Sequence, residues 1–211
     1  MQYLHQQNIA SQYTEALLVA VRAGHLDAMK WLLQHYSYRG EIAIDSVIDE
    51  AAKNGHLEIL QFLQYSDHPG QAVNAWWPQS RDAMNLAAAN GHLSVVEWLH
   101  TTGSQSCSTR AMDEAAANGH LDVVKWLYDH RLEGCTTKAM DEAARYGHLI
   151  VVQWLHDNTT AGCTIQAMQH AAVNGHVAVM MWLSQNFKLD CTPETFELVV
   201  AQSHSLCTLD S

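Results

Sequence analysis

The sequence predicts an all-α protein, a solenoid of stacked helix-turn-helix units, and the spacing of three residue types supports that prediction. A Gly-His pair recurs every 28 residues from Gly91 to Gly175, and a cysteine recurs at the same interval from Cys107 to Cys191. Each Gly-His pair follows an alanine-rich segment and precedes a segment rich in valine, tryptophan and leucine. A fixed period of this kind is typical of a tandem array of equivalent units.

The alanine-rich segment of each unit is predicted to be its first helix. In the unit that begins at Cys107, Met112, Ala115 and Ala116 have the i, i+3 and i+4 spacing of one helical stripe. The helix is expected to begin after a hydroxyl side chain that caps its free amide groups, and to end at Gly119. The equivalent capping residues are Ser108, Thr136, Thr164 and Thr192.

The segment after the glycine is predicted to be the second helix. Leu121, Val124 and Leu127 share one face of it, and Val123 and Trp126 widen that face. Each helix has about ten residues, and isolated helices of fewer than about 12 residues are marginal in water. Stacking must therefore supply the stability. We expect the large aromatic residues of the second helices to lie in the core: Trp31, Phe62, Trp98, Trp126, Trp154 and Trp182.

The same frame extends toward the N-terminus and predicts six full units. Their turn glycines are Gly24, Gly55, Gly91, Gly119, Gly147 and Gly175. The first two glycine spacings are 31 and 36 residues, so insertions of three and eight residues precede the second and third units. We expect residues 1–211 to form one domain, with residues 191–211 as a degenerate C-terminal cap. Residues 1–11 are expected to form an N-terminal lid over the apolar Leu18 and Val19.

The repeated pattern resembles the ankyrin repeat family over roughly residues 14–204, because sequences close to G-H-L-x-V-V-x-W-L follow an alanine-rich helix six times in one frame. The resemblance implies an ankyrin-type α-solenoid, a role in binding proteins and a concave face lined by the first helices. Two features depart from the family. K-A-M-D at Lys138 to Asp141 replaces T-P-L-H, and the period of 28 residues is shorter than the usual 33 or so. The missing residues belong to the family's projecting β-turn finger, so binding through fingers is not expected.

The histidines and cysteines recur too regularly to converge on one metal ion. The turn histidines are His25, His56, His92, His120, His148 and His176. A zinc site needs ligands within about 2 Å of one ion, whereas these side chains would form a ladder that bonds turn carbonyls or the neighbouring unit. Equivalent cysteines on stacked helices would lie about 8 to 10 Å apart, too far for a disulfide. We predict no metal site, no cofactor and no catalytic residue.

Composition and charge argue against several classes of function. The sequence has no Gly-rich phosphate loop, nucleophile elbow or zinc-protease motif, so an enzyme is not expected. The net charge of −11 opposes nonspecific binding to nucleic acid or to an anionic membrane. No apolar run is long enough to span a membrane, and Met1–Ser11 lack the basic and apolar residues of a signal peptide. We expect a cytoplasmic monomer, or a secreted protein if a leader has been removed.

Candidate binding residues lie where the units differ on the outward side of the first helices. The outward pairs are Asp49 with Glu50, Asn85 with Leu86, Asp113 with Glu114, Asp141 with Glu142, and Gln169 with His170. Three of the five pairs are acidic, which favours a protein partner with a basic or polar face. Arg145 is a further candidate, because the residue before the turn also varies. Trp76 and Trp77 are adjacent in the longer insertion, either exposed as an anchor or buried by it.

These observations favour a non-catalytic protein-interaction module that binds a partner on the concave helix face. Two alternatives stay open: a spacer segment of a longer repeat array with no binding site, and a secreted effector directed at a host. The second alternative comes from the resemblance alone. Short-period ankyrin arrays of this kind are similar to those found in large numbers in filamentous eukaryotic microbes, where some are classed as secreted effectors.

Overall fold

The structure is a computed structural model that describes residues 2–35, 44–65, 82–103 and 107–187. The described residues form helices α1 to α12 and contain no strand, which confirms the predicted fold class. The chain divides into two compact units, Met1–Cys107 and Ser108–Ser211. The expectation of one domain over 1–211 stays a prediction. The proposed cap at 191–211 and the Trp76 and Trp77 pair lie outside the described residues.

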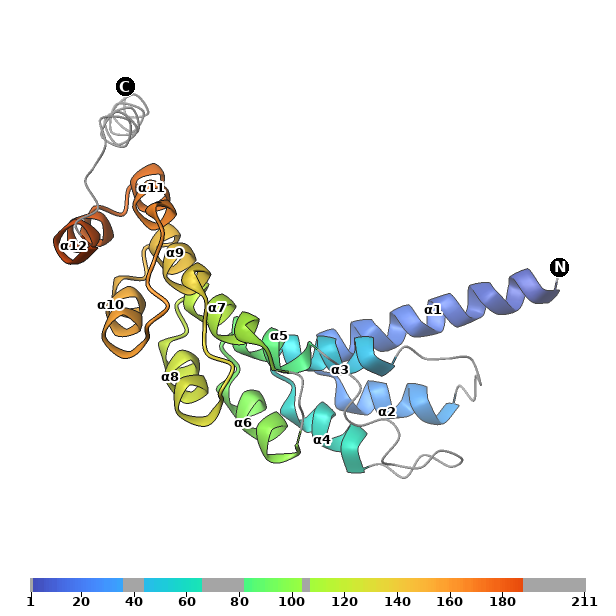
Figure 1. Ribbon diagram of the computed structural model, residues 1–211. Helices are drawn as coiled ribbons and strands as arrows, with labels where there is room; N and C mark the ends of the chain where they lie inside the picture. The colour runs from blue at the N-terminus through green and yellow to red at the C-terminus, as the bar shows by residue number, and fades with distance from the viewer. Residues whose placement is uncertain (1, 36–43, 66–81, 104–106, 188–211) are drawn as a thin grey trace, which may run out of the picture. The chain divides into compact units, whose positions relative to one another are not determined.

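The first unit contains three helix pairs. They are α1 (Gln2–Arg22) with α2 (Leu26–His35), α3 (Ile44–Lys53) with α4 (Leu57–Tyr65), and α5 (Ala83–Ala89) with α6 (Leu93–Thr101). The first helices α1, α3 and α5 pack side by side, and each contacts the second helix of its own pair (Figure 1). Small residues of the first helices, such as Ala51 and Ala87, are fully buried and allow this close approach.

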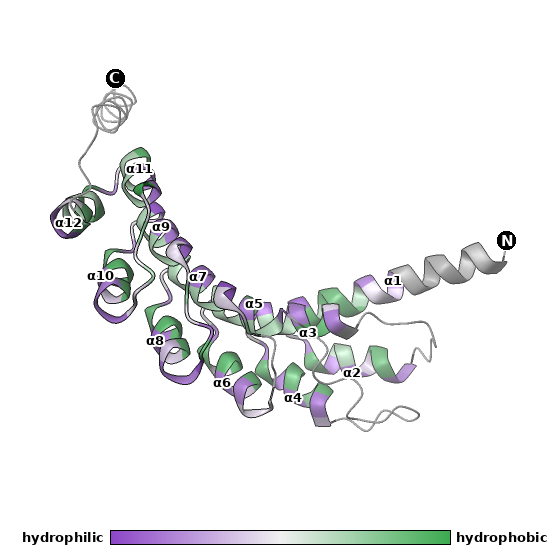
Figure 2. Ribbon diagram, viewed as in Figure 1, coloured by the Kyte–Doolittle hydropathy of each residue, from purple (hydrophilic) through white to green (hydrophobic). Residues whose placement is uncertain are grey.

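The second unit repeats this arrangement with less variation. Its pairs are α7 (Thr109–Ala117) with α8 (Leu121–His130), α9 (Thr137–Arg145) with α10 (Leu149–Asn158), and α11 (Ile165–Val173) with α12 (Val177–Phe187). Helix α9 packs between α7 and α11. Figure 2 shows α8 and α10 hydrophobic toward the first helices and hydrophilic on the opposite side. The core repeats as well, because Met112, Met140 and Met168 are buried at equivalent positions.

The first helices of the second unit begin and end as predicted. The hydroxyl oxygens of Ser108, Thr136 and Thr164 each accept a hydrogen bond from the amide two residues later, at 3.1 to 3.3 Å. At the other end Gly119 has a φ of 79°, the left-handed conformation that favours glycine. The second helix begins two residues after this glycine, at Leu121. Local sequence therefore determines both ends of these helices.

The aromatic residues of the second helices are less buried than predicted. Trp31 is 52% exposed, so the prediction is wrong for this residue. Phe62 and the other tryptophans are half-buried. In the second unit they contact aromatic residues of the preceding helix pair edge to face, Tyr128 with Trp154 at 5.3 Å and His156 with Trp182 at 5.2 Å between ring centroids. The aromatic residues thus link neighbouring pairs at the edge of the core rather than in its centre.

Trp126→Ala should consequently lower the free energy of unfolding by about 1.5 to 3 kcal/mol, below the 3 to 5 kcal/mol typical of a fully buried tryptophan. The indole is half-buried and stacks on His130, with ring centroids 4.4 Å apart. Trp31→Ala is the matched comparison, because Trp31 stacks on His35 at the same 4.4 Å but is more exposed. Urea unfolding should give the smaller loss for Trp31→Ala, and the opposite order would contradict this assignment of burial.

The expected N-terminal lid stays a prediction, because the side chains of residues 1–11 lie outside the described ones. Helix α1 runs from Gln2 to Arg22 and carries Val19. Val19 is 51% exposed, so the outward apolar position predicted there is present.

Candidate partner-binding surface

Three of the turn histidines connect their helix pair to the preceding one. The ring Nε2 of His56 lies 3.0 Å from the carbonyl oxygen of Arg22, and Nε2 of His92 lies 3.0 Å from that of Lys53. His148 makes a hydrogen bond to backbone in the same way. A carbonyl oxygen only accepts hydrogen bonds, so the ring nitrogen must donate. The prediction that these histidines hydrogen-bond the neighbouring repeat is confirmed for these three residues.

The surroundings of the His148 ring disfavour its charged form. Burial is the main cause that lowers the pKa of His148, and the charges of His120 and His176 lower it further. The hydrogen bond to the Ala117 backbone acts in the opposite direction. A neutral imidazole needs only one donor nitrogen, which this bond uses. The hydrogen bonds of His56, His92 and His148 therefore give these three rings a structural role.

Asp113 links α7 to the start of α9 through two hydrogen bonds. The backbone amide of Thr136 donates to Asp113 Oδ1 at 2.7 Å, and the Thr136 hydroxyl donates to Oδ2 at 2.8 Å. Asp141 repeats both bonds with Thr164, each at 2.8 Å. The two carboxylates are 7% and 3% exposed. Each aspartate thus holds the capping residue of the next first helix through short, charge-assisted hydrogen bonds.

The prediction that Asp113 and Asp141 face outward is wrong for this reason. It is also wrong for Asn85, which is 2% exposed and donates to Asp82 Oδ1 at 3.2 Å. A first helix in a stack is covered on its lateral sides as well as on its core side. The three residues point toward a lateral neighbour or their own helix start rather than toward solvent, so they are not available to a partner.

Three further acidic residues of the first helices, Glu50, Glu114 and Glu142, are paired with arginines. Glu50 contacts Arg22 at 3.2 Å, and this hydrogen bond is the main cause that lowers the pKa of Glu50, with burial opposing it. In the second unit, the pairs are Arg110 with Glu114 at 3.0 Å and Arg145 with Glu142 at 3.4 Å. In the second unit the first helices consequently present balanced charge, whereas exposed carboxylates occur on the second helices: Asp122, Asp129 and Asp157.

The other predicted residues differ in exposure. Gln169 is exposed, while Asp49, Leu86 and His170 are half-buried. His170 Nδ1 lies 4.0 Å from Glu142 Oε1 and is itself buried with no hydrogen-bond partner. Helices α9 and α11 pack against each other, so Glu142, Arg145 and His170 form one polar region of the second unit.

An apolar patch beside this region was missed by the sequence analysis. We call the residues Arg145, Tyr146, Ile150, Val173 and Val177 the turn patch, because they flank the turns after α9 and α11. Its four apolar residues are exposed: Tyr146 by 54%, Ile150 by 68%, Val173 by 39% and Val177 by 54%. The Arg145 guanidinium lies over the Tyr146 ring, 5.6 Å from its centroid. The available signal was a departure from the repeat, since Ala117, Asn118 and Asp122 occupy three of the equivalent positions one helix pair earlier.

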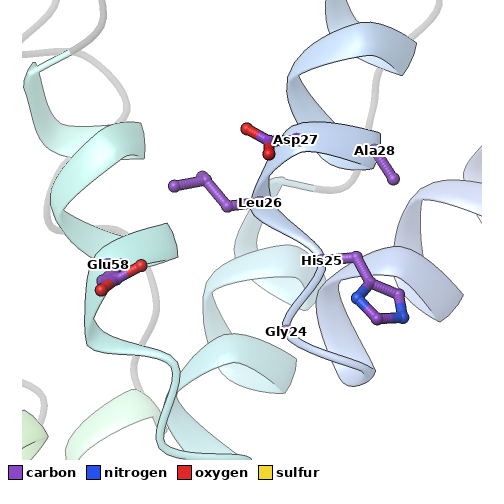
Figure 3. Close-up of a pocket in the computed structure, with 6 residues that line it drawn as sticks. All are labelled: Gly24, His25, Leu26, Asp27, Ala28 and Glu58. Carbon is purple, nitrogen blue, oxygen red and sulfur yellow. The ribbon is translucent and has the colours of Figure 1, made fainter.

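An open pocket of about 570 Å³ lies in the first unit, beside the turn between α1 and α2. It is lined by Gly24, His25, Leu26, Asp27 and Ala28, together with Glu58 of α4. Figure 3 shows Leu26 and Asp27 on the side toward α4, while the His25 ring points away. The two carboxylates come from neighbouring helices and are both exposed. The pocket offers no enclosed apolar lining of the kind that small-molecule sites need.

The periodic cysteines are half-buried and lie outside any disulfide among the described residues. They are Cys107, Cys135 and Cys163 among the described residues, whereas Cys191 and Cys207 fall outside them. Burial, and next the charge of Asp141, raise the pKa of Cys163 to about 11. Burial likewise raises the pKa of Cys135. Both thiols stay protonated at neutral pH and are poor nucleophiles and metal ligands.

Within the four described ranges, no group of three or more His, Cys, Asp or Glu side chains is placed to hold a metal ion. None of the helices in the described part of the chain is both long and apolar enough to cross a membrane.

Two family models match the chain. One, described as ankyrin repeats (3 copies), matches residues 48–141, and the other, described as ankyrin repeats (many copies), matches residues 17–64. Together they span residues 17–141, more than half of the 211 residues. No curated protein is found to match the chain.

Proposed function

The chain belongs to the ankyrin repeat family, and we propose that it is a non-catalytic protein-interaction module that binds its partner through the first-helix face and the turn patch of the second unit. Ankyrin repeats generally mediate protein-protein interaction. The observation that carries the choice of surface is the turn patch, where the exposed Tyr146 and Ile150 replace the polar Asn118 and Asp122 of the preceding helix pair.

The chemistry of the turn patch suits an anchor for a protein partner. Single exposed apolar residues are common on protein surfaces, but a group of them beside charged residues is typical of an interaction site. Tyrosine and arginine are enriched among the residues that contribute most to binding. Tyr146 is stacked beneath the Arg145 guanidinium, so both side chains are partly ordered before a partner arrives.

The polar residues around the patch define the partner more closely. Glu142, Arg145, Gln169 and His170 would form its rim, and Glu114 would extend the rim onto α7. Because Glu114 and Glu142 already contact arginines of their own helices, we propose a partner with a polar face rather than a strongly basic one. Asp49, Glu50 and Leu86 belong to the corresponding face of the first unit, and Trp76 and Trp77 stay a candidate second contact.

We further propose that the protein acts as a monomer in the cytoplasm. The support for this location is that the described cysteines lie outside any disulfide, since thiols persist in the reducing cytosol and are oxidised in secreted proteins. The spacer and effector alternatives make a different prediction. A spacer has no partner of its own, and an effector would bind a protein of the host rather than of its own cell.

The test transplants the surface of one helix pair onto the next. A variant with Arg145→Ala, Tyr146→Asn and Ile150→Asp carries the residues found at 117, 118 and 122, which the same fold already accommodates. A protein recovered by affinity capture from the native organism would be purified and its dissociation constant measured by calorimetry. We expect affinity to fall by about tenfold or more, equivalent to about 1.4 kcal/mol.

The matched control is Gln153→Lys on α10, which likewise copies the residue one helix pair earlier, Lys125. It should leave the affinity unchanged. A second variant, Trp76→Ser with Trp77→Ser, tests the insertion in the same assay. The proposed surface is wrong if the transplanted variant binds like the parent protein while either of the other two variants loses affinity.

A further inference from the structure

Four of the six turns contain a sequence whose chemistry the proposed function does not use. Asparagine precedes the turn glycine at Asn54, Asn90, Asn118 and Asn174, whereas the other two turns have Ala23 and Tyr146. Asn-Gly is the dipeptide in which asparagine loses its side-chain amide most readily, because glycine has no Cβ to hinder attack by its backbone nitrogen. We infer that these four asparagines are latent deamidation sites, held unreactive by the closed turn and modified when their own helix pair opens.

The reaction needs only water. The glycine backbone nitrogen attacks Cγ of the asparagine and loses its proton, while the bond from Cγ to Nδ2 breaks and ammonia leaves. Water then opens the resulting succinimide on either side, which gives aspartate or isoaspartate. One water is consumed and one ammonia is released, so neither a cofactor nor an enzyme is required.

The closed turn holds both reacting groups in hydrogen bonds. The nucleophile, the Gly119 nitrogen, donates to the carbonyl of Ala116 at 3.1 Å. The departing amide, Asn118 Nδ2, donates to the carbonyl of Glu114 at 3.1 Å. Attack requires the glycine nitrogen to leave its carbonyl and the asparagine side chain to rotate away from the helix end. Both bonds must therefore break before the ring can close.

The same pair of bonds recurs at the other three sites. Each glycine nitrogen donates, at 3.1 to 3.2 Å, to the carbonyl of the residue three positions before the glycine. Each asparagine amide donates, at 2.7 to 2.9 Å, to the carbonyl of the residue four positions before the asparagine. Asn90, Asn118 and Asn174 are also exposed, so water can reach them when a turn opens. The local opening free energy, rather than access to water, sets the rate of modification.

Modification would weaken the turn that it enters. The asparagine amide is a donor for a carbonyl at the end of the first helix, where the backbone lacks partners. Its replacement by a carboxylate removes the donor and places a negative charge at the negative end of the helix dipole. Isoaspartate also lengthens the backbone within a turn that positions the next histidine. An opened and modified helix pair would thus close less well than before.

The experiment compares deamidation of the full chain in buffer and in guanidinium chloride at the same mildly alkaline pH, with peptide mapping by mass spectrometry over time. Folding in buffer is checked by circular dichroism. We expect Asn90 and Asn118 to deamidate at least about tenfold more slowly in buffer, because they lie in turns that must open first. Protection smaller than about tenfold at either residue would overturn the inference.

Two variants extend the test to the turn itself. Tyr146→Asn adds a fifth Asn-Gly turn at a position with the same backbone, and Asn118→Tyr removes one by copying Tyr146. Residue 146 should then deamidate in guanidinium chloride at a rate similar to that of Asn118 and be protected in buffer. Deamidation of that variant in buffer as fast as in denaturant would show that the closed turn does not protect, and would overturn the inference.

Discussion

Replacing Asp113 with alanine is expected to lower the free energy of unfolding by about 2 to 4 kcal/mol. The carboxylate is almost fully buried and accepts two hydrogen bonds from Thr136, and the substitution removes both. Hydrogen bonds to charged groups contribute about 1.5 to 3 kcal/mol each. Water that enters the space left by the side chain would offset part of that sum. Urea unfolding followed by tryptophan fluorescence measures the loss.

Two further variants separate this contact from a general effect of removing charge. Asp157→Ala removes an exposed carboxylate near the end of α10, where the helix dipole disfavours it, and should change stability by less than about 0.5 kcal/mol. Thr136→Val combined with Asp113→Ala should cost less than the sum of the two single changes. Additive losses would mean that Asp113 and Thr136 act independently, contrary to their contact in the structure.

Gly119→Ala is expected to cost about 2 to 4 kcal/mol, for two separate reasons. The residue has a φ of 79°, and the left-handed conformation costs an alanine about 1 to 2 kcal/mol. An added Cβ would also lie 2.7 Å from Nδ1 and Cε1 of the His148 ring. The imidazole must move to relieve that contact, which disturbs its hydrogen bond to the preceding turn, worth about 1 kcal/mol.

Gly134→Ala supplies the matched control. Gly134 has a similar φ of 68°, but a Cβ there would meet nothing within 4 Å. Its substitution should therefore cost only the conformational strain, about 1 to 2 kcal/mol. In a His148→Ala background, Gly119→Ala should fall to the same value. Equal losses for Gly119→Ala and Gly134→Ala in the parent protein would contradict the role of the histidine ladder in packing the turns.

The fold was predictable because its determinants are local. The stripe of Met112, Ala115 and Ala116 defines the first helix, and a capping hydroxyl with a left-handed glycine defines its ends. These signals depend on residues within about one helical turn of each other. The six-fold recurrence of the pattern then made the stack the simplest way to bury the stripes.

The role of Asp113 and Asp141 was not predictable from one helix considered alone. A helical projection divides a helix into one apolar side and one polar side, but a first helix within a stack also touches its two lateral neighbours. An aspartate on such a side is buried because the threonine at the start of the next first helix, 23 residues further along the chain, donates hydrogen bonds to it from its amide and hydroxyl. That spacing recurs in both pairs and is the signal that would have revealed the contact.

The turn patch was missed for the opposite reason. Periodicity emphasises what the units share, whereas Tyr146 and Ile150 are informative because they differ from Asn118 and Asp122. The exposed Trp31 shows the same limit, since it shares a repeat position with better buried tryptophans while its neighbours differ. Exposure depends on the adjacent helix pair, which a repeat pattern treats as constant.

Site-specific photo-crosslinking tests the central claim most directly. A benzophenone amino acid would replace Tyr146 in the turn patch or, in a second protein, Tyr128 on α8. Both are exposed tyrosines, at 54% and 44%. With the purified partner present, the account predicts a crosslinked adduct from position 146 and none from position 128. An adduct from position 128 and none from position 146 would contradict it and place the binding surface on the second helices.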